Sequence, residues 1–258
     1  MNKKLTTTQT CRLALVAAAI LAAAQTQAAD ITFAAPVSAT NTSVLDIPWL
    51  AGGTFVQGFT YGSGAKSFTT AGGQSISLAD GRGASLGNNV IMPAGTPSGT
   101  GGFYNAGGNQ WNNAGVSTDL QAWTDALDGN IYHGTATATD PLTLHLVGLT
   151  VGQTYDLSLF TTDNRGGSAG RTQDYWSSFS GTTYSGGTSG SFSETASEMV
   201  LGTFTADAVY QDIFLQATET GNPDTTLSIY TLYAVPEPSA MALAALGGAS
   251  LLFRRRRA

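Results

Sequence analysis

The C-terminal stretch Val235–Ala258, VPEPSAMALAALGGASLLFRRRRA, constrains this chain more than any other part of the sequence. It begins with the stiff segment Val235-Pro236-Glu237-Pro238, because each proline fixes its own φ and favours an extended preceding residue. An uncharged, mostly apolar run of fifteen residues, Ser239–Phe253, comes next. As a helix this run spans about 22 Å, less than a hydrocarbon core of about 30 Å. It therefore predicts a short membrane helix that spans only with local thinning of the bilayer.

Four consecutive cations follow the apolar run: Arg254, Arg255, Arg256 and Arg257. Arginines at a helix end extend toward the lipid headgroups, and positive charges stay on the cytoplasmic side of a membrane. We therefore expect everything before this tail to lie on the far side of that membrane.

The order of these three parts closely resembles the PEP-CTERM sorting signal, through Pro236, Glu237, Pro238 and the four terminal arginines. The resemblance covers under a tenth of the chain. It implies that a membrane-embedded exosortase recognises the tail and cleaves it near Pro-Glu-Pro. It also implies that the domain is then released, or attached, among extracellular polysaccharides. The alternative is a plain short membrane anchor that is never processed.

The first 28 residues predict a secretory signal peptide, with signal peptidase as a partner. Basic residues (Lys3, Lys4 and Arg12) accompany the apolar stretch Leu13–Ala24, and Thr26-Gln27-Ala28 suits cleavage after Ala28. The only cysteine, Cys11, leaves with this segment. The exported domain, residues 29–234, then has no thiol, which excludes disulfides, zinc–thiolate sites and a cysteine nucleophile.

Removing both ends makes the chain more acidic. Four basic residues remain against sixteen acidic residues, which gives the exported domain a net charge of −12 where the whole chain has −6. Such a surface repels nucleic acid and anionic lipid, and it suits neutral glycans better than acidic ones. We therefore expect no nucleic-acid partner.

The exported domain is rich in glycine and poor in charge, which is typical of extracellular β-proteins with many turns. Alternating apolar residues predict its strands. These strands contain Phe55, Phe59 and Tyr61; Ile76 and Leu78; Leu142, Leu144 and Leu146; Tyr155, Leu157 and Leu159; and the stretches 199–204, 209–215 and 227–233. The pattern predicts an all-β fold, an antiparallel two-sheet sandwich of jelly-roll type.

Two local motifs refine this fold. The capping box Thr118-Asp119-Leu120-Gln121 predicts one short helix, with Leu120, Trp123 and Leu127 as an apolar stripe on the sandwich edge and Gly129 as its end. The spacing of Leu149, Gly152 and Tyr155 resembles the tyrosine corner of Greek-key sandwiches, in which a tyrosine hydroxyl bonds an upstream backbone group.

The second half also resembles a sandwich module that often precedes PEP-CTERM tails. The matching residues are Gly148, Leu149, Gly152 and Tyr155, the segment from Asp163-Asn164-Arg165 to Arg171-Thr172, and Gly202–Asp207. Galactose-binding-like and other carbohydrate-binding domains are similar sandwiches, but the likeness of fold transfers no ligand.

The sequence gives weak signals for catalysis. Two segments, Gly83–Gly87 and Gly166–Gly170, match G-x-S-x-G but lack the strand and helix of a nucleophile elbow. The only histidines are His133 and His145; no acid after His145 has a spacing that suggests a triad, and we expect His145 to be structural. Two-carboxylate glycosidase chemistry remains open, because sixteen acids are available. We predict a protein that is not an enzyme.

Two binding hypotheses remain. Tyr104, Trp111, Tyr175, Trp176 and Tyr184 lie among Gly, Asn, Ser and Thr, as in a glycan platform, although such rings also close the ends of a core. Tyr104 and Trp111 belong to Gly99–Asn113, which we expect to be a loop. Asp125, Asp128 and Asn130, or Asp163 and Asn164, offer oxygen ligands for calcium without EF-hand spacing. Asx turns explain both sets, so we expect no cofactor and no metal.

The sequence therefore predicts a non-catalytic secreted or surface protein, sorted to the extracellular polysaccharide or biofilm matrix. It is expected to bind glycan through loop aromatics. The alternatives are an extracellular hydrolase of that matrix and a structural coat protein without a ligand.

Overall fold

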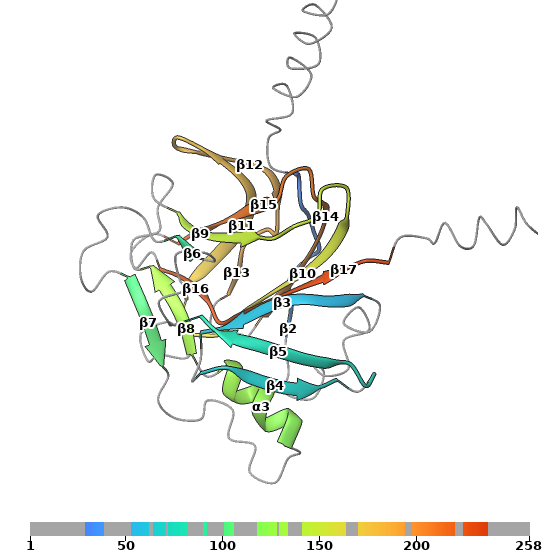
Figure 1. Ribbon diagram of the computed structural model, residues 1–258. Helices are drawn as coiled ribbons and strands as arrows, with labels where there is room; N and C mark the ends of the chain where they lie inside the picture. Colours follow the sequence, from blue (N-terminus) through green and yellow to red (C-terminus); the bar gives the residue numbers. More distant parts are fainter. Residues whose placement is uncertain are drawn as a thin grey trace, which may run out of the picture.

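The computed structural model describes residues 29–38, 53–61, 64–70, 72–81, 90–91, 101–105, 118–127, 129–133, 141–163, 170–193, 198–219 and 224–236. Strands dominate this part of the chain, accompanied by the helix α3 (Figure 1). The strands are β1 (Thr32–Phe33), β2 (Val37–Ser38), β3 (Thr54–Thr60), β4 (Lys66–Thr69), β5 (Ser75–Asp80), β6 (Val90–Ile91), β7 (Gly101–Asn105), β8 (Gly129–His133), β9 (Leu142–Val147), β10 (Thr154–Thr161), β11 (Thr172–Ser180), β12 (Thr183–Thr188), β13 (Phe192–Ser193), β14 (Glu198–Thr205), β15 (Tyr210–Ala217), β16 (Thr225–Leu227) and β17 (Ile229–Ala234). The helix is α3 (Thr118–Leu127), which begins at the predicted capping box.

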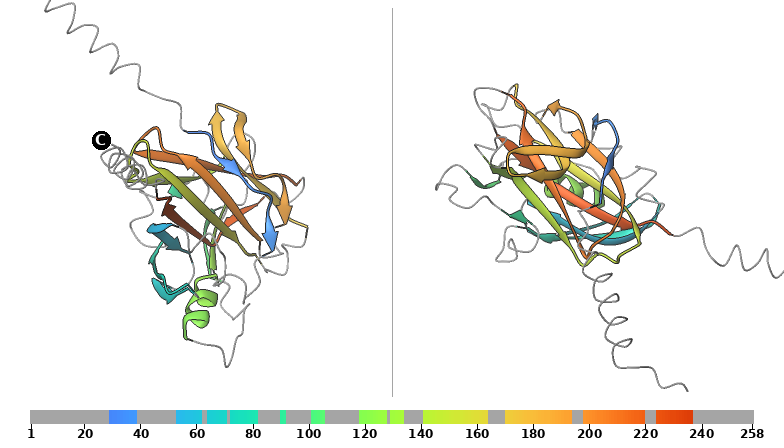
Figure 2. Two further views of the ribbon diagram at one scale, coloured as in Figure 1. Left: turned by 90° about the vertical axis from the view of Figure 1, so that its right-hand side faces the viewer. Right: turned by 90° about the horizontal axis from the view of Figure 1, so that it is seen from above.

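Two sheets pack face to face (Figures 1 and 2). The eight-stranded sheet has the order β1-β14-β10-β17-β3-β5-β4, with β2 beside β14, and the six-stranded sheet has the order β12-β11-β15-β9-β6, with β13 beside β11. Along the chain, β9, β10, β11, β14, β15 and β17 alternate between the two sheets. Such alternation is typical of a jelly roll, so the predicted all-β sandwich is confirmed. One pair, β3 with β5, is parallel, which is an exception to the predicted antiparallel pairing.

The main core lies between the two sheets, and alternate residues of the facing strands fill it. In β9, Leu142, Leu144 and Leu146 are at most 1% exposed, while the residues between them are half-buried. Burying each such side chain contributes roughly 1.5–3 kcal/mol. The leucine alternation in the sequence therefore decides which face of β9 points inward.

A second core lies between the outer side of the eight-stranded sheet and α3, which packs against the edge strand β4 (Figure 1). The Trp123 ring of α3 meets Phe68 and Phe160 edge to face, with ring centroids 5.1 and 4.9 Å apart. The helix packs mainly against β4, the last strand of the eight-stranded sheet, as the predicted position at the sandwich edge requires. From there its Trp123 ring reaches the outer side of the sheet, where Phe160 and Tyr233 need an apolar cover.

Two predicted strands differ from the observed ones. The sequence predicts that Phe55 and Phe59 share a face, but a register shift between Leu232 and Tyr233, opposite β3, places them against different cores. The predicted strand 227–233 is divided at Ser228, whose backbone N–H donates to the Phe160 carbonyl at 2.8 Å.

A three-stranded sheet, β16-β8-β7, adjoins the sandwich. Strand β7 occupies part of the segment that the sequence predicts to be a loop. Its backbone pairs with β8, which accounts for the strand.

The tyrosine corner forms as predicted. The Thr150 backbone N–H donates to the Tyr155 hydroxyl oxygen at 2.9 Å, and Tyr155 is 3% exposed. Gly152 adopts a φ of +87° in the turn, a conformation that a residue with a Cβ rarely adopts. This contact fixes the crossover from the six-stranded sheet to the eight-stranded sheet.

Candidate functional site

Four aromatic side chains form a continuous cluster on the six-stranded sheet. Ring centroids lie 5.9 Å apart for Trp176 and Tyr184, 4.8 Å for Tyr184 and Phe179, and 5.6 Å for Phe179 and Phe214. We call these four residues the aromatic cluster. All four are half-buried, so part of each remains accessible to solvent.

The strands β11, β12 and β15 position this cluster. Trp176 of β11 lies directly opposite Phe214 of β15, and Phe179 lies opposite Tyr184 of β12. The neighbours of Phe214 along β15, Ile213 and Leu215, are 0% exposed in the main core. Because side chains alternate along a strand, Phe214 and its cross-strand partner Trp176 face outward.

A polar pair lies beside the two rings. Asp174 of β11 is directly opposite Gln216 of β15. Asp174 comes two residues before Trp176 and Gln216 comes two residues after Phe214, so both lie on the same face as the rings. Burial raises the pKa of Asp174 from 3.8 to about 6, and the side chain of Trp176 partly opposes this shift. At neutral pH this position supplies a carboxylate, and Gln216 supplies an amide. Both groups hydrogen-bond well to hydroxyls.

A second polar pair continues the face on the other side. His145 of β9 is bonded through Nδ1 to the Asp212 carboxylate of β15, and its ring lies 5.3 Å from that of Tyr210. These contacts give His145 a structural role at this position.

The N-terminal segment holds the hairpin that carries Trp176 and Tyr184. Asp30 accepts hydrogen bonds from the Ser177 hydroxyl (2.6 Å) and the Gly187 backbone N–H (2.7 Å), and these bonds lower the pKa of the Asp30 carboxyl. A Cβ on Gly187 would lie 1.8 Å from the Ile31 carbonyl oxygen. Only glycine allows the blue strand β1 to lie so close to the orange β12 (Figure 2).

The structure corrects one predicted glycan contact. Tyr175 is 0% exposed in the main core, where its hydroxyl contacts Thr161 and accepts a hydrogen bond from Gln173 Nε2 at 3.0 Å. It points inward because it alternates with Trp176 along β11. Trp176 and Tyr184 join the cluster, whereas Trp111 and the side chain of Tyr104 lie outside the described residues.

The described residues of the first calcium candidate, Asp125 and Asn130, each bond to another group. Asp125 forms an ion pair with Lys66 at 3.2 Å, and Asn130, 2% exposed, donates from Nδ2 to the Thr162 carbonyl at 2.9 Å. Asp128 and Asn164 lie outside the described residues. Among the residues that are described, no three His, Cys, Asp or Glu side chains are grouped as a metal site.

Two buried carboxylates share one arginine, an arrangement that differs from the acid pair of a glycosidase, which flanks an open cleft. Arg171 Nη1 contacts Asp163 Oδ2 at 3.1 Å and Asp224 Oδ2 at 2.7 Å. The side chains of Asp163 and Asp224 are 0% and 5% exposed, so they line no open cleft. This buried triad is an ion-pair network, and Asp163 binds a guanidinium where the sequence suggested calcium.

Of the two G-x-S-x-G segments, Gly83–Gly87 and residues 166–169 lie outside the described residues.

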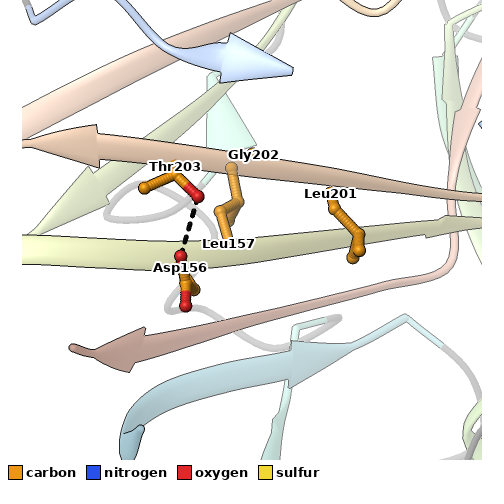
Figure 3. A pocket seen from close by; sticks show the side chains of 5 residues that line it. All are labelled: Asp156, Leu157, Leu201, Gly202 and Thr203. Carbon is orange, nitrogen blue, oxygen red and sulfur yellow. Dashed lines mark hydrogen bonds between the residues drawn. The ribbon is translucent and has the colours of Figure 1, made fainter. Parts of the chain in front are cut away.

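A small hollow of about 120 Å³ lies on the eight-stranded sheet between β10 and β14 (Figure 3). Asp156, Leu201 and Thr203 line it, and the Thr203 hydroxyl donates to Asp156 Oδ1 at 2.7 Å. Ligand pockets typically have about 300–1,000 Å³. This hollow is therefore smaller than a ligand site.

Sequence reasoning missed half of the aromatic cluster, Phe179 and Phe214, and the polar pair beside it. Phe214 lies in the predicted strand 209–215, where its alternation with Ile213 and Leu215 was the available signal for an outward ring. Its pairing with Trp176 joins residues 38 positions apart, which no local pattern shows.

Residues 234–257 match the family described as the PEP-CTERM protein-sorting motif. The chain carries this sorting motif. The match begins at Ala234, the last residue of β17, so the PEP-CTERM motif starts where the sandwich ends. In the described part of the chain, no helix is long and apolar enough to cross a membrane. The apolar run of the motif and the predicted signal peptide lie outside that part.

Solved structures show distant likeness. The chain is similar to the plant receptor-like kinase ANX1 (TM-score 0.47, 10% identity, covering 70% of this chain and 49% of that chain). It is also similar to the CBM22-1 xylan-binding domain of Xyn10C from Paenibacillus barcinonensis (TM-score 0.40, 9% identity, 71% and 96% covered). A third is the ANXUR1 extracellular domain from Arabidopsis thaliana (TM-score 0.40, 12% identity, 70% and 48% covered). The chain spans about half the length of both plant chains. No curated protein matches its sequence.

Proposed function

We propose that this chain is a non-catalytic surface protein that binds a neutral polysaccharide on the aromatic cluster. An exosortase sorts it through the PEP-CTERM motif at residues 234–257. Signal peptidase removes the first 28 residues, and the tail holds the domain at the membrane before its transfer to the cell surface or the extracellular matrix.

The observation that supports binding is the outward Trp176–Phe214 pair with Asp174 and Gln216 beside it. Aromatic faces pack on the C–H surfaces of sugars, while carboxylate and amide groups hydrogen-bond their hydroxyls. Apolar surface with a few polar groups is the usual composition of a ligand site. The net charge of −12 expected for the exported domain disfavours acidic polysaccharides.

The test is binding of the protein to exopolysaccharide purified from the producing organism. We expect Trp176→Ala and Phe214→Ala each to weaken binding about tenfold, equivalent to about 1.4 kcal/mol. Tyr132→Ala is the matched control, because Tyr132 is half-buried on the separate three-stranded sheet and should leave binding unchanged. Affinity electrophoresis with and without chelator measures this, and it also tests the weak calcium hypothesis.

Two results would replace this proposal. A wild-type protein that fails to bind any neutral polysaccharide would favour the structural coat. Release of reducing ends from the polysaccharide would favour the hydrolase.

A further inference from the structure

The tail begins at the end of β17, where hydrogen bonds fix the position of Val235. The Val235 backbone N–H donates to the Thr154 carbonyl at 2.9 Å, and Gln153 Nε2 donates to the Val235 carbonyl at 2.7 Å. Strand β17 lies between β10 and β3, and its end projects to the right in Figure 1. Pro236 follows at once, with its φ fixed by the ring. The tail therefore starts from one position and direction.

The segment between this point and the apolar run is short. Pro236-Glu237-Pro238 spans about 9 Å when extended, and a headgroup layer is about 5–8 Å thick on each side of the bilayer. The apolar run is itself shorter than a hydrocarbon core, which leaves no slack. When the tail is in a bilayer, the end of the sandwich around Val235 must lie at the headgroups.

That end of the sandwich displays exposed valines. The turn at residues 148–153 and the turn at residues 206–209 lie side by side, because Gly152 N–H donates to the Ala206 carbonyl (2.7 Å) and Leu149 N–H to the Val209 carbonyl (3.1 Å). Val151 is 59% exposed and Val209 is 63% exposed, the highest fractions among large apolar side chains of the described residues. We call these two valines the tail-exit rim.

A third exposed valine gives the contrast. Val37 is 44% exposed but pairs with Met199, at the other end of β14 from the turn that carries Val209. Six residue-to-residue steps along the strand, about 20 Å, separate Met199 from Thr205 at the tail end. Exposed valine is therefore present at both ends, and only one end is beside the tail.

We propose that the tail-exit rim is a membrane-contact surface, which rests in the headgroup layer of a neutral bilayer while the tail is held there. This inference rests on the membrane hold in the proposed function. Contact at two turns beside the tail fixes the tilt of the domain, and it presents the Val235–Pro238 segment at a constant height above the bilayer. The acidic domain favours zwitterionic over anionic lipid.

The experiment uses the full chain with Cys11→Ser, which leaves no other cysteine. Single cysteines are introduced as Val151→Cys, Val209→Cys, Val37→Cys and Ser250→Cys, labelled with an environment-sensitive fluorophore, and reconstituted in phosphatidylcholine vesicles. We expect the labels at Val151 and Val209 to emit at shorter wavelength and to be quenched less by aqueous iodide than the label at Val37. The Ser250 label reports whether the tail is in the bilayer. Replacing a third of the lipid by phosphatidylglycerol should reduce the shielding at Val151 and Val209.

The outcomes separate the two proposals. If the Ser250 label is shielded but iodide quenches the labels at Val151 and Val209 as much as the label at Val37, the membrane contact is overturned. The retention of the tail in the membrane then still stands. A Ser250 label that iodide quenches freely overturns the hold, and the membrane contact with it. Unchanged rim shielding in anionic vesicles overturns the assignment to neutral lipid.

Discussion

The outer faces of the two sheets both carry aromatic residues, but they bury them to different degrees. On the eight-stranded sheet, Phe160 and Tyr233 are each 1% exposed beneath the second core. On the six-stranded sheet, Trp176 and Phe214 are half-buried. The helix α3, which packs against β4 and β8, covers the face of the eight-stranded sheet through its Trp123 ring, which meets Phe160.

The neighbours of the rings explain the difference. On the covered face, the hydroxyls of Ser158 and Thr231 hydrogen-bond to each other, so burial leaves neither group unpaired. On the other face, Trp176 and Phe214 lie between the Asp174–Gln216 pair and Asp212. Asp212 is bonded to His145, whereas burial already disfavours the charged form of Asp174, as its raised pKa shows. Covering the Asp174 carboxylate completely would cost several kcal/mol, so this face stays accessible. Aromatic content alone therefore does not distinguish a core from a site, whereas the polar neighbours do.

The largest expected effect distinguishes the two faces directly. Trp123→Ala should lower the free energy of unfolding by about 3–5 kcal/mol, because Trp123 is 1% exposed and fills the second core. Trp176→Ala, the same change on the half-buried face, should cost about 1–2 kcal/mol. Urea unfolding monitored by circular dichroism measures both. Equal losses would mean that the aromatic cluster is a core and not a site.

The next largest effect on stability is expected at the buried triad, which connects the two sheets. Asp163 follows β10 of one sheet, Arg171 precedes β11 of the other, and Asp224 completes the buried triad. Arg171→Met should cost about 3 kcal/mol, because it removes the cation that lies between two buried carboxylates. Lys66→Met is the control, since Lys66 and Asp125 are 18% and 36% exposed and such a pair contributes less than about 1 kcal/mol. A loss below that of the control would show that solvent reaches the triad.

Much of the fold was predictable because its signals are local. The leucines of β9, the capping box of α3 and the Thr150–Tyr155 contact of the tyrosine corner each span only a few residues. The tail motif is equally local, with its three parts within 24 residues. Period and spacing are sufficient for such features.

The parts that sequence reasoning missed depend on long-range pairing. Whether Tyr175 or Trp176 points outward depends on which face of β11 meets the eight-stranded sheet. Asp30 supports the hairpin across 157 residues of sequence. The register shift that separates Phe55 from Phe59 lies in the pairing of β3 with β17. A one-residue change of register reverses which face a side chain occupies, so no pattern within one strand predicts these contacts.

The smallest effect tests why the second face stays accessible. In the unfolded chain the Asp174 carboxyl has a pKa of 3.8, and burial raises the pKa to about 6 in the folded protein. The folded state therefore holds this proton more tightly, so the contribution of Asp174 to stability is greatest below pH 3.8 and is lost as the pH rises through 6. Asp174→Asn removes this loss and should raise the free energy of unfolding by about 1 kcal/mol at pH 7, after allowance for partial solvation. Its effect at pH 3.5 should be near zero. Gln216→Ala changes the cross-strand neighbour without a titrating group, and its effect should be the same at both pH values. Urea unfolding at the two pH values measures this. If Asp174→Asn raised the free energy of unfolding equally at both, the gain would come from packing, and the carboxylate would not be the reason that this face remains accessible.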